Sequence, residues 1–182
     1  DITGSQFGVM LFPDLQQGLS ELVRVTKPGG HVMLVTMGPP SEIEFLEFFL
    51  EAVRSAVPRF TGLPMDPPPL AFQVSDPETL REKLADAGLA DIRVETANHR
   101  LEFESGTRMW GWVTASNPIG AEMIADLTAE QVTAAQTALD AKLRERSGGR
   151  DPAVLNNMVN IAIGMKPSVP TDKSNDNKET TN

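Results

Sequence analysis

The stretch ELVRVTKPGGHVMLVTMG, residues 21–38, decides the fold. Residues 21–26 of this stretch are the end of a helix that the spacing of apolar residues predicts over residues 13–26. Pro28 cannot continue that helix, and the glycine pair after it permits a tight turn. Residues 31–38 are then almost wholly apolar, which is typical of a parallel strand that helices cover on both faces.

The residues before this helix complete a strand-helix-strand unit. Residues 2–12 have the pattern of a buried strand followed by a loop, so strand, helix and strand succeed one another. Such a unit with parallel strands is a right-handed crossover. The sequence therefore predicts the α/β fold class.

Composition excludes several classes of protein. The chain has 182 residues, 40% of them hydrophobic, and a formal net charge of -9, which disfavours a surface that binds nucleic acid. It has no cysteine and only two histidines, so a thiolate or multi-histidine metal site is not expected. No apolar run is long enough for a membrane span. A cytoplasmic enzyme or binding domain fits these properties.

Further elements follow from periodicity and capping signals. Ser41 and Ser75 begin capping-box patterns, which predict one helix over residues 42–57 and another that ends at Gly88. The other predicted elements are a proline-rich connector over 62–70, a strand over 90–103, a polar helical stretch over 105–126, an amphipathic helix over 128–146 with a capping box of Thr128 and Gln131, and a last strand over 158–166.

Three segments, in this order, resemble the second half of class I S-adenosylmethionine-dependent methyltransferases. The resemblance is to the small-molecule type that includes the enzymes of ubiquinone and menaquinone biosynthesis. The segments are SQFGVMLFPD (5–14), ELVRVTKPGG (21–30) and DPETLREKLADAGLADIRVE (76–95). Residues 1–103 match the family pattern, residues 153–166 resemble its seventh strand, and residues 104–152 are not typical of it.

The resemblance implies a Rossmann-like sheet, S-adenosyl-L-methionine as cofactor and a small-molecule methyl acceptor. The family's strand order is 3-2-1-4-5-7-6, of which this chain would supply strands 4-5-7-6, with the last strand antiparallel. The family's glycine-rich cofactor turn has no counterpart here. We therefore expect residues 1–166 to be the C-terminal part of a methyltransferase domain, inactive alone, with the N-terminal half in the same gene product. Residues 167–182 are polar and are predicted to be a disordered tail.

The loop after the first predicted strand is the expected cofactor site, since ligands of open α/β sheets bind beyond the carboxyl ends of the strands. By resemblance, Ser5, Gln6 and Phe7 lie near the cofactor, and Met10 and Phe12 pack against cofactor or acceptor. A plain core position is the alternative for the apolar members, and for Phe12 it has equal weight. The loop lacks the Asn/Asp-Pro-Pro-Tyr/Phe motif of nucleic-acid base methylases, which favours a small metabolite.

Two inserts, residues 39–70 and 104–152, are expected to arch over this site as a lid. Their large aromatic side chains could shape an acceptor pocket and exclude water. These side chains are Phe45, Phe48, Phe49, Trp110 and Trp112. A thick core helix is the alternative for the three phenylalanines. His99 is the one nearby candidate for a general base, with an ordinary surface histidine as its alternative.

Two other functions stay open at this point. A non-catalytic methyltransferase-like half-domain would bind a partner chain through an open strand edge. A nicotinamide-dependent dehydrogenase would share the doubly wound fold, but no catalytic pair of that kind is visible.

Overall fold

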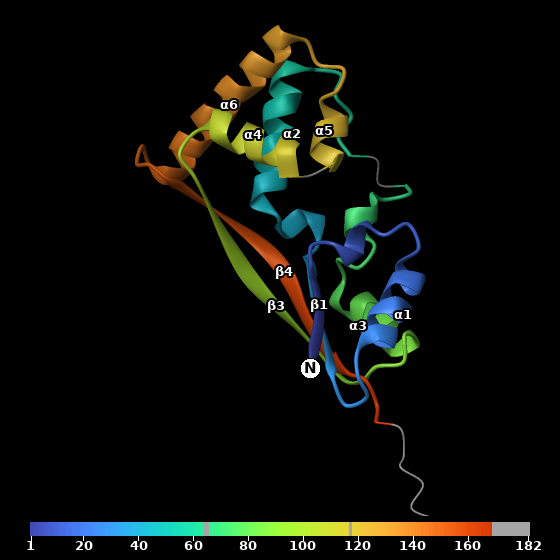
Figure 1. Ribbon diagram of the computed structural model, residues 1–182. Coiled ribbons are helices and arrows are strands. Elements are labelled where there is room, and N and C mark those ends of the chain that lie inside the picture. Colours follow the sequence, from blue (N-terminus) through green and yellow to red (C-terminus); the bar gives the residue numbers. More distant parts are fainter. Residues whose placement is uncertain (64–65, 117, 169–182) are drawn as a thin grey trace, which may run out of the picture.

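The computed structural model describes residues 1–63, 66–116 and 118–168 (Figure 1). Its four strands form one sheet in the order β1-β2-β4-β3. They are β1 (Ile2–Gln6), β2 (His31–Met37), β3 (Ala90–Phe103) and β4 (Ala153–Met165). β1 and β2 are parallel, and β4 is antiparallel to both β2 and β3. The predicted α/β class with an antiparallel last strand is confirmed.

The helices fall into two groups (Figure 1). The described helices are α1 (Leu15–Val25), α2 (Glu44–Ala56), α3 (Pro77–Asp86), α4 (Gly106–Ser116), α5 (Pro118–Met123) and α6 (Ala129–Ser147). α1 and α3 lie together beside the sheet, whereas α2, α4, α5 and α6 form a helical lobe at the far end of β3 and β4. These two long antiparallel strands are called the β3–β4 hairpin below, although α4, α5 and α6 connect them in the chain. Most of residues 167–182, the predicted tail, lie outside the described residues.

Helix starts follow local signals in three cases and not in a fourth. Asp14 and Asp76 cap α1 and α3 by accepting hydrogen bonds from backbone N–H groups three residues on. Thr128 and Gln131 form the predicted capping box of α6. The predicted boxes at Ser41 and Ser75 are wrong. Residues 40–42 form a 3-10 turn, and α2 begins after Ile43 without a side-chain cap. At α3 the cap is Asp76, and the Ser75 hydroxyl donates to the carbonyl of Phe72 instead.

Two hydrophobic cores share the hairpin. The sheet core packs α1 and α3 on the sheet and includes Leu19, Leu84 and Ala162. The lobe core joins α2, α4 and α6 to the far half of the hairpin and includes Phe49 and Leu155.

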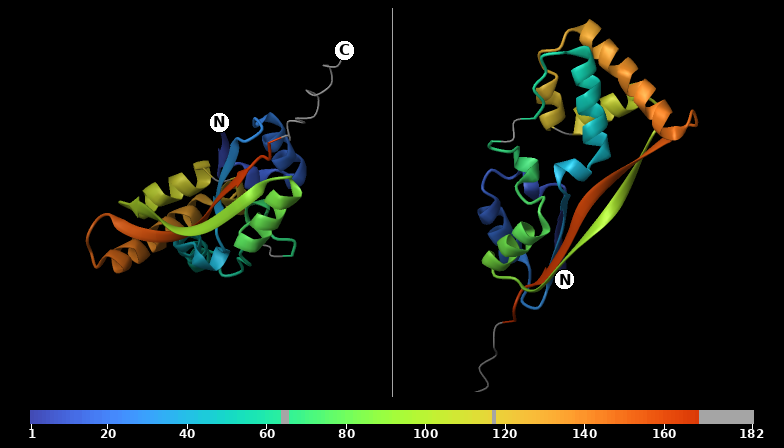
Figure 2. Two further views of the ribbon diagram at one scale, coloured as in Figure 1. Left: turned by 90° about the horizontal axis from the view of Figure 1, so that it is seen from below. Right: turned by 180° about the vertical axis from the view of Figure 1, so that it is seen from behind.

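The hairpin presents opposite faces to the two cores. Buried side chains alternate along β4 up to Val159, and the alternation then shifts by one residue at Asn160, which is also buried. Two-stranded ribbons twist strongly, so a change of face along the ribbon keeps both halves turned toward the helices. Figure 2, seen from behind, shows these helices on one side of the hairpin.

The expectation that helices cover both faces of the central strand is wrong. In β2, Val32, Leu34 and Thr36 are buried, but Met33 on the opposite face is 41% exposed. β1 is not a buried strand either, because among the described residues it pairs with β2 alone and Ile2 is 70% exposed. An apolar face of the sheet is therefore open to solvent in the part of the chain that is described.

Candidate functional site

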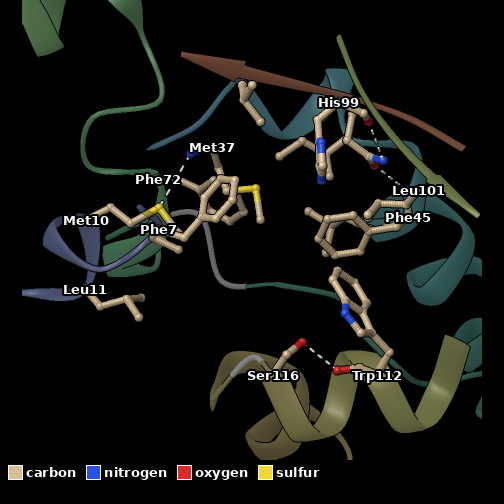
Figure 3. A pocket seen from close by; sticks show the side chains of 15 residues that line it. Phe7, Met10, Leu11, Met37, Phe45, Phe72, His99, Leu101, Trp112 and Ser116 are labelled. Atoms are coloured by element: carbon tan, nitrogen blue, oxygen red, sulfur yellow. Dashed lines mark hydrogen bonds between the residues drawn. The ribbon is translucent and has the colours of Figure 1, made fainter. Parts of the chain in front are cut away.

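A cavity of about 170 Å³ lies beyond the carboxyl ends of β1 and β2, between the two cores (Figure 3). Its wall is mainly apolar and comes from the loop after β1, the end of β2, α2, α4 and the middle of the hairpin. The large side chains in this wall are Phe7, Met10, Met37, Phe45, Phe72 and Trp112, and the polar ones are His99, Ser116 and Asn157. The cavity lies at the edge of the sheet where the sequence predicts a ligand.

The loop after β1 is held tightly at its start. Phe7 has φ +54°, an uncommon conformation for a bulky residue, and its N–H donates to the Val35 carbonyl at 2.8 Å. The Ser5 hydroxyl accepts a hydrogen bond from the N–H of Val9 at 2.9 Å and so caps the 3-10 turn Val9–Leu11. This turn brings Met10 to the cavity.

Gln73 holds the same loop from the other side. Its Nε2 donates to the carbonyl of Met10 at 2.8 Å and to that of Phe12 at 3.1 Å. Gln73 directly follows the 3-10 turn Leu70–Phe72, whose last residue also lines the cavity. Sequence reasoning missed Gln73, because its partners are more than 60 residues away and no local pattern marks it.

The predicted loop residues therefore separate into three groups. Phe7 and Met10 line the cavity. Ser5 is engaged in the turn, and Gln6 is exposed, so contact of either with a cofactor stays a prediction. Phe12 is outside the cavity wall: it is 41% exposed and its ring lies against Gly18, where a Cβ atom would come within 2.2 Å of it.

The predicted lid aromatics separate in the same way. Phe45 and Trp112 line the cavity, with ring centroids 5.2 Å apart in an edge-to-face arrangement. Phe49 and Trp110 are instead packed on each other in the lobe core at 4.9 Å, so the core alternative describes them. Phe48 is half-buried beside Lys142, whose Nζ is 5.3 Å from its ring centroid.

Asn157 is a buried residue of the cavity wall that sequence reasoning also missed. Its Oδ1 accepts from the N–H of Phe45 at 3.0 Å, at the unsatisfied start of α2. Its Nδ2 donates to the carbonyls of Leu155 and His99 at 3.1 and 3.2 Å. A side-chain amide inside an apolar strand was the available signal. Asn157 thus joins α2 to the hairpin rather than facing the cavity with free polar atoms.

His99 contributes the titratable side chain of the cavity wall. It lies on β3, opposite Asn157 on β4, and its ring centroid is 6.5 Å from that of Phe7. Figure 3 shows the imidazole projecting toward the middle of the cavity. His99 is also exposed, so its ring contacts both the cavity and solvent.

Charged groups lie around the cavity rather than in its wall. At the start of α2, Glu44 accepts two hydrogen bonds of 2.9 Å from Arg146 and one of 2.6 Å from the N–H of Asn156. Far from the site, a hydrogen bond from Arg24 lowers the pKa of Glu21, and the N–H of Thr79 lowers that of Asp76.

Within the described residues, no group of three or more histidine, aspartate or glutamate side chains could hold a metal ion. Nor does any helix there have the length and apolarity to cross a membrane.

Comparison with known proteins gives one match in sequence. The chain is 28% identical over 100 residues to a demethylmenaquinone methyltransferase of Mycolicibacterium paratuberculosis, a match that covers 51% of this chain. It covers 44% of that relative, so the chain matches less than half of the relative's length. No family model matches the chain. The match agrees with the resemblance to class I methyltransferases seen in the sequence segments.

Solved structures give looser matches. YcgJ from Bacillus subtilis has a TM-score of 0.47 at 16% identity, covering 93% of this chain and 64% of that one. Phosphoethanolamine N-methyltransferase 2 of Haemonchus contortus, solved with phosphomonomethylethanolamine and S-adenosylhomocysteine, has a TM-score of 0.42 at 16% identity. That match covers 92% of this chain and 33% of the Haemonchus protein.

Proposed function

We propose that this chain forms the acceptor side of a methyltransferase that uses S-adenosyl-L-methionine and acts on a small apolar acceptor. The observation that carries the proposal is the apolar cavity at the carboxyl ends of β1 and β2. Open α/β sheets bind their ligands at that edge. The sequence match to a methyltransferase supports the same reaction. A cytoplasmic location belongs to this proposal.

The wall of the cavity suits the cofactor's reacting group. S-adenosylmethionine, when bound, supplies a methyl group on a positively charged sulfonium. Aromatic faces attract cations, and Phe7, Phe45 and Trp112 place such rings at the cavity. No charged side chain among the described wall residues would repel the sulfonium. Under this proposal Phe7 and Met10 lie beside the cofactor, and Ser5 and Gln6 precede them.

The acceptor is proposed to present an apolar ring to the cavity. An engineered cavity of about 150 Å³ with an apolar wall binds benzene. The cavity here, at about 170 Å³, has room for a ring of similar size with a small substituent. The name of the sequence relative, whose acceptor is demethylmenaquinone, favours a ring compound as well.

The two inserts are proposed to close over this acceptor. α2, in residues 39–70, contributes Phe45, and α4, in residues 104–152, contributes Trp112. Both side chains keep water from the reacting atoms, which favours a displacement at a sulfonium. Alignment of acceptor and methyl group supplies much of the rate.

The sheet is proposed to continue past β1 with strands from the same gene product. Within the described residues β1 pairs with β2 alone, so the N–H and C=O groups on its outer edge are free to pair. In the family that this chain resembles, the strand at the position of β1 pairs with the strand that leads into the glycine-rich cofactor turn. Under this proposal methyl transfer needs the full gene product, and this chain is inactive alone.

Two matched variants on α2 test the proposal. In the full gene product, Phe45→Leu should lower methyl transfer to a ring acceptor, because Phe45 lines the cavity. Phe48→Leu, three residues on, should leave the rate within about twofold, because Phe48 is half-buried beside Lys142 and is not part of the cavity wall. Titration with S-adenosylhomocysteine measures cofactor binding separately. If both variants bind S-adenosylhomocysteine normally and transfer the methyl group at equal rates, the proposed site is wrong.

A second candidate function rests on the open face of the sheet. Ile2, Met33 and Ile161 lie on that face with exposures of 70%, 41% and 39%, next to the free edge of β1. Contiguous exposed apolar groups mark interaction sites. A non-catalytic half-domain would bind a separate chain through the open edge of β1, and that chain would also cover this face. Co-expression with a separately encoded polypeptide carrying a glycine-rich turn, followed by sedimentation, distinguishes this function from the first.

A further inference from the structure

We propose that the imidazole of His99 accepts the proton of an ionisable hydroxyl group on an aromatic acceptor bound in the cavity. The inference deepens the proposed function and rests on it, because it names the class of acceptor, a hydroxylated aromatic ring. It starts from the cavity wall, which is apolar except for three side chains. Two of these three are engaged in other contacts.

The engaged side chains are Asn157 and Ser116. Asn157 donates to two backbone carbonyls and accepts from the N–H of Phe45. Ser116 donates its hydroxyl proton to the carbonyl of Trp112, within its own helix. For His99, by contrast, no hydrogen bond joins a ring nitrogen to another group within residues 1–63, 66–116 and 118–168. His99 is thus the wall residue with a basic nitrogen available to a ligand.

The neighbouring backbone fixes where His99 lies. Its carbonyl accepts from Nδ2 of Asn157 across the hairpin, and β3 and β4 are paired continuously on both sides of it. The ring of Phe7 lies beside the imidazole with the planes inclined by 43°. A flat ligand that enters the cavity therefore meets the imidazole near Phe7 and Phe45.

Few charged groups share this environment. On β3, Arg100 and Glu102 alternate with His99 and Leu101, so they lie on the other face of the strand. On α2, Glu44 is held by Arg146 and the N–H of Asn156. The loop after β1, the turn Leu70–Phe72 and α4 contribute no charged side chain to the wall among the described residues. Among the described residues of the wall, His99 is therefore the one that carries a basic side chain.

The proton transfer balances with methyl transfer. The acceptor's O–H bond breaks, and its proton forms an N–H bond with the unprotonated imidazole. An oxygen electron pair then forms the O–C bond to the cofactor's methyl carbon as the C–S bond breaks. The sulfur keeps the electron pair of that bond and leaves as a neutral thioether. Because His99 is also exposed, the imidazolium passes its proton to solvent.

The test uses 4-nitrophenol, a single-ring phenol whose ionised form absorbs visible light, and the 182-residue chain. Bound phenolate is measured at slightly acidic pH in the wild type, in His99→Gln and in His31→Gln. The only other histidine, His31, is on β2 and is not part of the cavity wall, so it is a matched control. Binding itself is measured by calorimetry in each variant.

The expected result is a larger phenolate fraction for bound than for free probe in the wild type and in His31→Gln. In His99→Gln the fraction should fall below that of free probe, since an apolar cavity disfavours the charged form. The NMR signal of the His99 ring, identified by its loss in the variant, should move toward the protonated position when the probe binds. Equal phenolate fractions in wild type and His99→Gln, or a probe that does not bind, would overturn the proposal.

A separate measurement distinguishes this proposal from the proposed function. If His99 is the base, His99→Gln in the full gene product should lower kcat for a phenolic acceptor by about 10²-fold or more. Binding of S-adenosylhomocysteine should not change. Methyl transfer that continues at the wild-type rate in His99→Gln would refute the role of His99 and leave the methyltransferase function standing. Absence of methyl transfer, together with a normal phenolate result, would refute the function alone.

Discussion

At the scale of single residues, Lys166 closes the carboxyl end of α1. Its Nζ donates to the carbonyls of Val23, Arg24 and Thr26 at 2.8, 3.1 and 2.8 Å. These oxygens carry the negative end of the helix dipole and have no partner within the helix ladder. Lys166 therefore joins the end of β4 to α1 by charge-assisted hydrogen bonds.

Replacing Lys166 by Met should lower the free energy of unfolding by about 1–2 kcal/mol, because three carbonyls lose a charged donor. Urea denaturation measures the change. Lys27→Met is the control: Lys27 pairs with Asp1 at 3.0 Å on the surface, and such pairs contribute about 1 kcal/mol or less. Equal losses in the two variants would show that Lys166 is not a helix cap.

Asp76 gives a pH dependence at the start of α3. Hydrogen bonds from the N–H and hydroxyl of Thr79 lower the pKa of Asp76. A carboxyl with a lowered folded-state pKa stabilises the protein above its ordinary pKa, and this stability is lost as pH falls through the folded value. Wild-type protein should therefore lose more stability than Asp76→Asn as pH falls below about 4.

Urea midpoints at pH 7, 4 and 3 measure this difference. Asp126→Asn, a change at an exposed residue after α5, is the control and should follow the wild type. If Asp76→Asn lost stability with acid as steeply as the wild type, the cap would carry no charge effect.

Some residues could be identified from sequence and others could not, for a physical reason. Asp14, Thr128 and Gln131 act within four residues of their own positions, so a local pattern contains the whole interaction. Gln73 acts on backbone atoms more than 60 residues away, and Asn157 joins the distant backbone of Phe45 and His99, 112 and 58 residues away. Only the folded chain brings those partners together.

At the scale of elements, the loop after β1 is a short segment held by neighbours on two sides. β2 accepts the N–H of Phe7, and Gln73 donates to Met10 and Phe12. The start of α2 that the sequence predicts at Ser41 is wrong for a reason that belongs to this scale. Its first turn is satisfied by Asn157 from β4 instead of by a local cap, so the Ser41 pattern was overridden by a tertiary contact.

Removing the Gln73 amide should loosen the loop. In Gln73→Leu the carbonyls of Met10 and Phe12 lose their donor, and hydrogen exchange of residues 7–12 should become faster by about tenfold, the equivalent of one hydrogen bond. Mass spectrometry after deuterium labelling measures this rate. Gln17→Leu, an exposed change on α1, should leave the loop's exchange unchanged. Unaltered exchange in Gln73→Leu would mean that β2 alone holds the loop.

At the scale of the whole molecule, the strand order β1-β2-β4-β3 is the one that the family resemblance implied, whereas the apolar pattern of the strands did not predict how the sheet is covered. The apolar stretch 31–38 indicated helices on both faces. In the structure Met33 and Ile161 are exposed, because α1 and α3 pack on the opposite face of this part of the sheet. Residue type shows that a face is apolar, whereas what covers it depends on segments that the pattern of one strand does not contain.

The hairpin should make the two cores unfold together. β4 contributes Leu155 to the lobe core and Ala162 to the sheet core without interruption, and Met37 packs against both. Both tryptophans lie in α4, so their fluorescence reports on the lobe. Leu84→Ala, a buried truncation in the sheet core, should cost about 2–5 kcal/mol.

If the cores are coupled, Leu84→Ala lowers the urea midpoint seen by tryptophan fluorescence and the midpoint seen by circular dichroism by the same amount. Phe49→Ala, in the lobe core, is the converse variant and should also move both midpoints together. If the two cores unfolded independently, Leu84→Ala would leave the fluorescence midpoint unchanged, and circular dichroism would show an additional transition at lower urea concentration. Because the cavity lies between the cores, coupled unfolding also means that a ligand bound there stabilises both at once.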